Sequence, residues 1–127
     1  MKVLVLGAAG MAGHTIALYF KEQGHDVTAF SRKPFPFCSW IQGDAFDAGR
    51  LRAVIVDGDY DAVINCIGLL NQFAESAPEK AVYINSYLPH RIVAWLEDKR
   101  TRFIQMSTDC VFAGNTGPYS ENSFPDG

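Results

Sequence analysis

Short runs of apolar residues alternate along this chain with longer stretches in which apolar positions recur at helical spacing. Such alternation is typical of repeated β-α units built around a parallel sheet. The first run, KVLVL at residues 2–6, is almost wholly apolar and is followed directly by Gly7. It predicts a central parallel strand that is buried on both faces.

A helix is predicted over residues 11–23, and Gly24 follows it at the position where a left-handed residue caps a helix. The segment HDVTAF at residues 25–30 is rich in β-formers and would return beside the first strand, closing a right-handed βαβ unit. The helix is indicated by apolar residues that recur at helical spacing, Ala12, Ile16, Tyr19 and Phe20.

The middle of the chain predicts shorter elements. Residues 31–37 are turn-rich, and a short strand at 39–41 and a short helix at 48–56 are expected after them. The apolar run DAVINC at residues 61–66 predicts another buried strand. RFIQM at residues 102–106 predicts a fifth strand.

One long helix is predicted between the last two strands, over residues 77–99. Ser76 and Glu79 have the spacing of a capping box, and Pro78 would stand in the first turn. Pro89 lies inside the helix and should bend it. The face that packs on the sheet is marked by Leu88, Ile92 and Leu96.

These elements together predict one α/β domain over residues 1–127, a Rossmann-type parallel sheet of about five strands in the order 3-2-1-4-5 with helices on both faces. Reversal of the strand order after the first strand would place a crevice at the carboxyl ends of strands one and four. That crevice is where a ligand is expected.

Gly7, Gly10 and Gly13 form a G-x-x-G-x-x-G turn between the first strand and the first helix. Gly7 lets the chain turn sharply, Gly10 lets a pyrophosphate approach backbone N–H groups, and Gly13 permits close packing of helix on sheet. The spacing favours dinucleotide binding over a glycine turn that merely begins a helix. His14 could reach a phosphate, but we expect a solvated side chain.

The end of the second strand bears on which dinucleotide is bound. Ser31, Arg32 and Lys33 offer a hydroxyl and two cations suited to a 2′-phosphate, where an acidic residue would accept from a ribose 2′-hydroxyl. NADP is therefore expected, with NAD possible. The alternative is that Arg32 and Lys33 form a solvated turn.

Composition narrows the class of protein. Of 127 residues 48% are hydrophobic, and the net charge is −3, without the basic stripe that nucleic-acid binding requires. The apolar start is too short for a membrane span or a signal peptide. Three widely spaced cysteines indicate reduced thiols in a cytoplasmic protein and no metal site. Cys110 is expected to be a small buried hydrophobe, with a catalytic thiol as the alternative.

Three segments carry a family resemblance: LGAAGMAG at residues 6–13, NCIG at 65–68, and MSTDCVFAG at 106–114, which PYSEN follows at 118–122. They resemble the extended short-chain dehydrogenase/reductase family, most closely its dTDP-4-dehydrorhamnose reductase branch. The resemblance implies NAD(P)-dependent reduction of a nucleotide-linked 4-keto deoxysugar. A sugar-nucleotide epimerase or dehydratase, and a non-catalytic dinucleotide-binding module, are the alternatives.

The resemblance also implies site residues. Asp44 would lie near the adenine, and Thr108 would polarise the substrate carbonyl, beside Ser107 and the acid Asp109. We also count Asn85 among the cofactor-binding residues. The pyrophosphate would be lined by Ala8, Ala9, Gly10, Met11 and Ala12, and the cofactor ribose by Cys66, Ile67 and Gly68.

Members of that family complete the site with a Tyr-x-x-x-Lys pair, in which the lysine lowers the pKa of the tyrosine. No tyrosine of this chain has a lysine four positions on. We therefore expect a C-terminally truncated domain that lacks the part holding the nucleotide sugar. An uncovered fifth strand predicts self-association into a homo-oligomer, or a loosely ordered tail from about Val111.

Overall fold

The computed structural model describes residues 1–70 and 72–127. Five parallel strands form one sheet in the order β3-β2-β1-β4-β5, which confirms the predicted Rossmann-type topology. The strand bounds lie within a residue or so of the predicted ones. They are β1 (Lys2–Leu6), β2 (Asp26–Ser31), β3 (Ser39–Gln42), β4 (Ala62–Asn65) and β5 (Arg102–Gln105).

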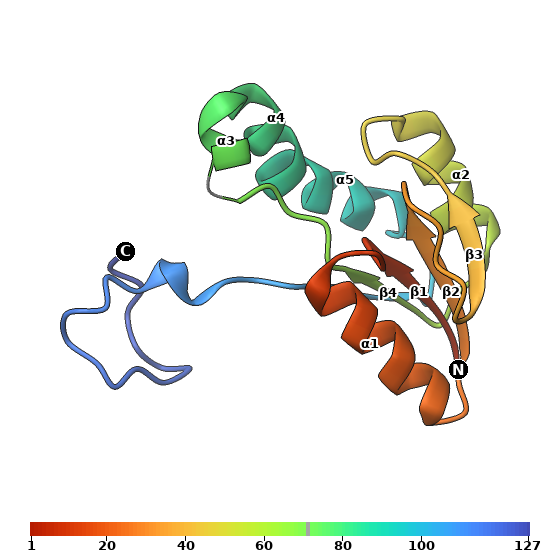
Figure 1. Cartoon of the computed structure of the whole chain (residues 1–127), viewed down its shortest axis with the longest axis horizontal. Helices are drawn as coiled ribbons and strands as arrows, with labels where there is room; N and C mark the ends of the chain where they lie inside the picture. Colours follow the sequence, from red (N-terminus) through yellow and green to blue (C-terminus); the bar gives the residue numbers. More distant parts are fainter. Residues whose placement is uncertain (71) are drawn as a thin grey trace.

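The sheet is covered on both faces, because alternate residues of each buried strand point to opposite sides. Val3 and Val5 of β1 belong to the apolar cluster under α1 (Met11–Glu22). Leu4 and Leu6 belong to a second cluster, which contains buried residues of α2 (Ala48–Asp57) and α5 (Leu88–Trp95). Figure 1 shows α1 on one side of the sheet and the other two helices on the opposite side.

Helix α1 begins and ends nearly as predicted, and its most buried face is formed by small residues. Gly13 and Ala17 are its buried residues, whereas Ala12 is exposed and Tyr19 is 57% exposed. The helix lies so close to the strand that only small residues fit at the contact, which apolar periodicity alone does not indicate. Gly24, with φ +79°, ends the helix as predicted.

The predicted long helix after β4 is divided. The structure has α3 (Gln72–Ser76), α4 (Pro78–Val82), a π-helical turn η1 (Tyr83–Tyr87) and then α5. The capping-box prediction is wrong, because Ala77 is the N-cap of α4 and the Ser76 hydroxyl instead donates to the Phe73 carbonyl at 3.3 Å. Ser76 is instead the last residue of α3.

Pro89 accounts for the position of the π-helical turn. A proline inside a helix lacks the N–H that would bond backwards, and its ring crowds the preceding turn. The Leu88 N–H donates to the Tyr83 carbonyl, five residues back, so the chain widens just before the proline. The predicted sheet-facing residues Leu88, Ile92 and Leu96 are all buried.

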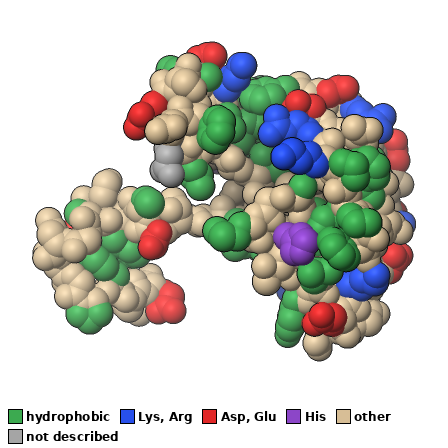
Figure 2. Space-filling view, viewed as in Figure 1, with side chains coloured by type: hydrophobic (Ala, Val, Ile, Leu, Met, Phe, Trp, Pro, Cys, Tyr) green, Lys and Arg blue, Asp and Glu red, His purple; other side chains and the backbone are tan. Residues whose placement is uncertain are grey.

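Residues 106–127 leave the sheet and include only the 3₁₀ turn η2 (Asp109–Val111) as a helical element. Figures 1 and 2 show this segment as a separate lobe joined to the body by a narrow neck. The Tyr119 hydroxyl accepts from the backbone N–H groups of Gly114 and Thr116 at 3.1 and 3.2 Å, and its ring stacks on Phe112. Hydrogen bonding, mainly with Thr116, lowers the pKa of Tyr119.

Candidate functional site

A cleft of about 310 Å³ opens at the carboxyl ends of the central strands, where the strand order reverses. Crevices at this point are where ligands of doubly wound α/β proteins bind. Its lining residues come from the glycine turn after β1, the chain after β2, the β3–α2 connection, the chain after β4, and the π-helical turn. The predicted crevice is therefore present.

The glycine turn lies at the centre of the cleft. Gly7 has φ +77° and donates its N–H to the Phe30 carbonyl at 2.8 Å. Gly10 is the N-cap of α1 and provides no side-chain cap, so the amides of the first turn remain available to an anion. A Cβ on Gly10 would meet only the Gly7 carbonyl oxygen, at 3.3 Å, and would otherwise extend into open space.

Gly13 has the packing role that was predicted for it. A Cβ there would overlap the Gly7 carbonyl oxygen and lie 3.0 Å from the Ala8 Cα. Gly13 is accordingly buried between helix and strand and does not line the cleft. Met11 and Ala12 also lie outside its lining, and the Met11 side chain is 91% exposed.

Ser31, Arg32 and Lys33 line one end of the cleft. Ser31 is buried, and its hydroxyl donates to the Lys33 carbonyl at 2.6 Å while accepting from the Trp40 indole at 3.0 Å. This hydroxyl therefore stabilises the turn, and because it already donates to Lys33 it has no hydrogen left to donate to a ligand. Arg32 and Lys33 are exposed and carry the positive charge of this end.

The connection between β3 and α2 forms the adjacent wall through Gly43, Asp44, Ala45 and Phe46. Asp44 accepts from the Phe46 N–H at 3.0 Å, which closes a tight turn. Phe46, 43% exposed, stacks on Tyr83 with ring centroids 5.3 Å apart and an interplanar angle of 24°. Asp44 is the only residue of this group that was predicted to bind the cofactor, because Phe46 is part of no recognised motif.

Cys66, Ile67 and Gly68 line the other end of the cleft. Asn65 beneath them is fully buried, and it accepts from the Ile67 N–H at 3.2 Å and donates to Gln105 at 2.8 Å. Burial raises the pKa of the Cys66 thiol to about 11, so the thiol is protonated at neutral pH.

Asn85 does not line the cleft, but its side chain binds the backbone of Leu69, which does. Its side-chain amide accepts from the Leu69 N–H at 2.9 Å and donates to the Leu69 carbonyl at 2.7 Å. Ile84, its neighbour in the π-helical turn, is buried and does line the cleft. Phe30, Leu69 and Ile84 also line the cleft and were not predicted, because in the sequence they resemble ordinary core residues.

Ser107, Thr108 and Asp109 lie beyond β5 and do not line this cleft. All three are exposed, and the Thr108 hydroxyl accepts from the Cys110 N–H at 3.2 Å at the start of η2. Backbone pairing of Met106 with Asn65 holds the neck of the segment at the carboxyl end of β4. The trio is therefore at the sheet edge where ligands bind, on the far side of β4 from the glycine turn.

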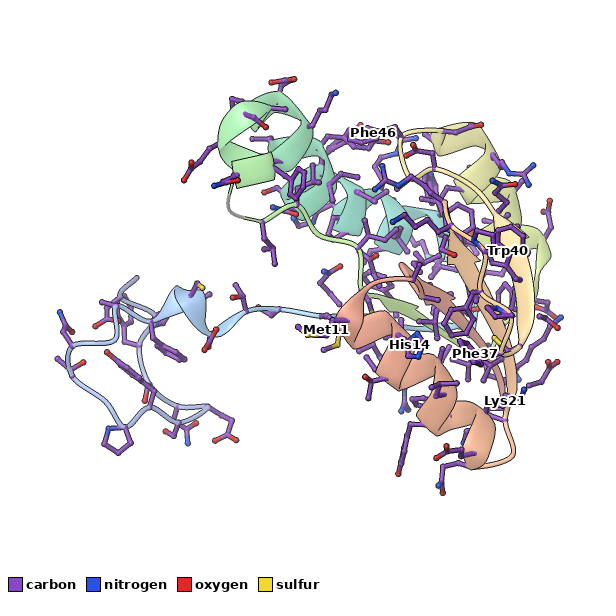
Figure 3. The ribbon with its side chains drawn as sticks, in the orientation of Figure 1. Met11, His14, Lys21, Phe37, Trp40 and Phe46 are labelled. Atoms are coloured by element: carbon purple, nitrogen blue, oxygen red, sulfur yellow. The ribbon has the colours of Figure 1, made fainter. Side chains whose placement is uncertain are left out.

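Cys110 and His14 lie in surroundings that differ from the predicted ones. Cys110 is exposed, because η2 stands outside the core. His14 is half-buried, with its ring edge-on to Phe35 and Phe37 at 5.3 and 5.2 Å between ring centroids, so it is not simply solvated. Figure 3 shows His14 on α1 and Phe37 beside it.

The described residues include no helix that is long and apolar enough to cross a membrane. A parallel sheet of this order, with a glycine-rich turn and a helix N-terminus at the cleft where the strand order reverses, defines a Rossmann-type fold. The family model for the NAD-dependent epimerase/dehydratase family matches residues 3–126, and the chain belongs to that family.

Individual relatives agree with this membership. A probable low-salt glycan biosynthesis reductase of Haloferax volcanii is 36% identical over 98% of the chain, and the dTDP-4-dehydrorhamnose reductase of Streptomyces griseus is 30% identical over 94%. The chain spans 43% and 37% of their lengths. The structure of a hypothetical dTDP-4-dehydrorhamnose reductase from Sulfolobus tokodaii matches 99% of the chain and 46% of its own, at a TM-score of 0.86 and 27% identity.

Proposed function

We propose that this chain is the cofactor-binding part of an NAD(P)H-dependent reductase that acts on a nucleotide-linked 4-keto deoxysugar. The observation that carries the proposal is the cleft at the sheet's switch point, built around an uncapped helix N-terminus behind three glycines. Relatives named as reductases of dTDP-linked sugars support the reaction class. The nucleotide sugar would be held largely by residues outside this chain.

The residues present fit a dinucleotide. The amides after Gly10 would hold the pyrophosphate, which a side chain at that position would obstruct. One end of the cleft would take the adenosine half, beside Arg32 and Asp44, and the other the nicotinamide half, beside Cys66 and Gly68. The bound cofactor would supply the hydride, while the chain would bind it and orient it.

Preference for NADPH over NADH is part of the proposal. Arg32 and Lys33 are exposed cations at the end of β2, where the 2′-substituent of the adenosine ribose is read in such folds. A 2′-phosphate would pair with them, whereas a 2′-hydroxyl would gain little. Arg32→Ala should lower NADPH affinity about tenfold and change NADH affinity little, and equal losses for both would contradict the preference.

Thr108 is proposed to donate a hydrogen bond to the substrate carbonyl, with Ser107 and Asp109 beside it. The support is chemical and positional. The Thr108 oxygen is engaged as an acceptor by the Cys110 N–H, which leaves its hydrogen for a ligand. The segment begins at the carboxyl edge of the sheet, next to the end of β4.

Calorimetry of the 127-residue chain with NADPH and NADH tests the central claim. We expect binding in the wild type and its loss in Gly10→Val, because a β-branched side chain would project into the space that the pyrophosphate needs. Gly49→Ala is the matched control, since a Cβ there makes only an ordinary contact with Asp47. A folded wild-type chain that binds neither dinucleotide would end the proposal.

Two alternative functions can each be tested by experiment. The family description favours a sugar-nucleotide epimerase or dehydratase as the second candidate, and net consumption of NADPH by a protein containing the whole site would exclude it. A non-catalytic dinucleotide-binding module is compatible with this chain, which has no Tyr-x-x-x-Lys pair. Oxidation of NADPH by these 127 residues with a 4-keto sugar nucleotide would exclude that reading.

A further inference from the structure

Phe46 is a large apolar side chain left 43% exposed on the wall of the cleft. It follows β3, which pairs with β2, so it lies in the same half of the cleft as the cations that follow β2. Exposed aromatic surface inside a ligand cleft is area that a ligand can bury. Figure 3 shows Phe46 on the β3–α2 connection.

The backbone that carries Phe46 is fixed by a series of hydrogen bonds. Its N–H donates to the Asp44 carboxylate at 3.0 Å, and Asp47 caps α2 by accepting from the Arg50 N–H at 3.0 Å. The Arg50 guanidinium donates twice to the Gln42 carbonyl, at 2.9 and 2.8 Å, and so ties α2 to the end of β3. The ring therefore projects from a short and well-bonded turn.

The ring is also supported from one side. Tyr83 stacks on it and packs against the main apolar core. Tyr87 lies next to Tyr83 at 5.7 Å between ring centroids, and the Arg91 guanidinium lies over the Tyr87 ring at 5.5 Å and over the Trp95 ring at 5.2 Å. A continuous aromatic and cationic row thus runs from the cleft along one side of η1 and α5.

We propose that Phe46 is a binding residue for the dinucleotide and that the adenine base stacks against its exposed surface. The inference rests on the proposed dinucleotide-binding function and adds the element that would recognise the base. Every base presents a π-face, and stacking on an aromatic side chain in offset geometry is favourable. A ring that is already fixed by Tyr83 loses little freedom when a base stacks on it.

The test compares three probes on the intact 127-residue chain: ADP, reduced nicotinamide mononucleotide and NADPH. Phe46→Ala should weaken ADP and NADPH binding by the same factor, about tenfold, and leave competition by the mononucleotide unchanged. General loosening of the cleft would weaken all three probes. Loss confined to ligands that contain adenine therefore separates base recognition from a structural role.

Further variants keep the test decisive. Phe46→Trp should retain ADP affinity and Phe46→Leu should lose it, which also covers the case in which Phe46→Ala does not fold. Phe37→Ala is the matched control, because Phe37 is 44% exposed and lies outside the cleft. ADP affinity that is unchanged in Phe46→Ala and Phe46→Leu, with NADPH bound by the wild type, would overturn the stacking role alone. A wild type that binds none of the probes would overturn the dinucleotide function and this inference with it.

Discussion

At the scale of single residues, the contact between Gly13 and the Gly7 carbonyl determines how closely α1 packs on the sheet. Gly13→Ala should lower the free energy of unfolding by about 2 kcal/mol, because the added Cβ overlaps backbone that cannot move independently. Urea denaturation measures the change. Gly49→Ala in α2 is the control and should stabilise the chain by about 0.5–1 kcal/mol through helix propensity. Equal stability of Gly13→Ala and wild type would contradict the packing role.

The thiols should differ in reactivity. Burial raises the pKa of Cys66 from 9.0 to about 11, so at pH 8 we expect iodoacetamide to modify the exposed Cys110 well before Cys66. NADPH should protect Cys66 further, because this residue lines the cleft, and should leave Cys110 unaffected. Mass spectrometry of timed samples measures both rates. Faster modification of Cys66 would contradict its burial.

The same pKa shift gives a sign for the effect of pH on stability. The folded chain holds the Cys66 proton more tightly than the unfolded chain, so this contribution to stability is present below about pH 9 and is lost as the pH rises toward 11.

Residue roles that follow from backbone conformation could be predicted from sequence, whereas roles that depend on neighbours could not. Gly24 was predicted as a left-handed cap and Gly7 as a sharp turn from their places beside predicted elements, and both have a positive φ. The exposure of Cys110 and the packing of His14 against two phenylalanines depend on where the tail and the 31–37 segment lie. Nothing in the residue types themselves carries that information.

At the scale of secondary-structure elements, the π-helical turn is the feature that organises one wall of the cleft. Asn85→Ala should remove both bonds to Leu69, lower the free energy of unfolding by about 1 kcal/mol, and weaken dinucleotide binding. Hydrogen exchange at the Leu69 amide should accelerate, which urea denaturation alone would not reveal. Ser86→Ala, at an exposed position of the same turn, is the control. Unchanged hydrogen exchange at the Leu69 amide in Asn85→Ala would contradict this role of Asn85.

The strands were predictable from sequence because each buried strand is a short apolar run that ends in a polar or glycine-rich segment. The division of residues 72–95 was not. Helical spacing placed Leu88, Ile92 and Leu96 correctly, but the widening before Pro89 preserves the apolar face while shifting the residues that precede it. Hydrophobic periodicity does not distinguish a π-helical turn of five residues from a turn of α-helix.

At the scale of the whole molecule, the β-α order and the glycine turn were enough to predict the sheet and the position of the cleft. Of the predicted cofactor residues, the cleft brings together those at strand ends, because strand order determines which ends meet. It is lined by Gly7, Ala9, Gly10, Ser31, Arg32, Lys33, Asp44, Cys66, Ile67 and Gly68. The position of Ser107, Thr108 and Asp109 depends on the path of the chain after β5, which apolar patterning does not specify.

The uncovered side of β5 is the basis of the last prediction. β5 pairs only with β4 within the described sheet, and Ile104 and Met106 are 39% and 42% exposed beside it. An outer strand with unpaired backbone groups and apolar side chains recruits another strand, so we expect the chain to self-associate with rising concentration. Sedimentation velocity measures this directly.

Ile104→Lys should shift the chain toward monomer, because a charge on an edge strand opposes pairing. Val93→Lys, on the exposed surface of α5, is the matched control and should leave association unchanged. A wild type that stays monomeric at high concentration would show that the tail or the solvent satisfies this edge, and a lysine at position 93 that disperses the oligomer would place the interface on the helices instead.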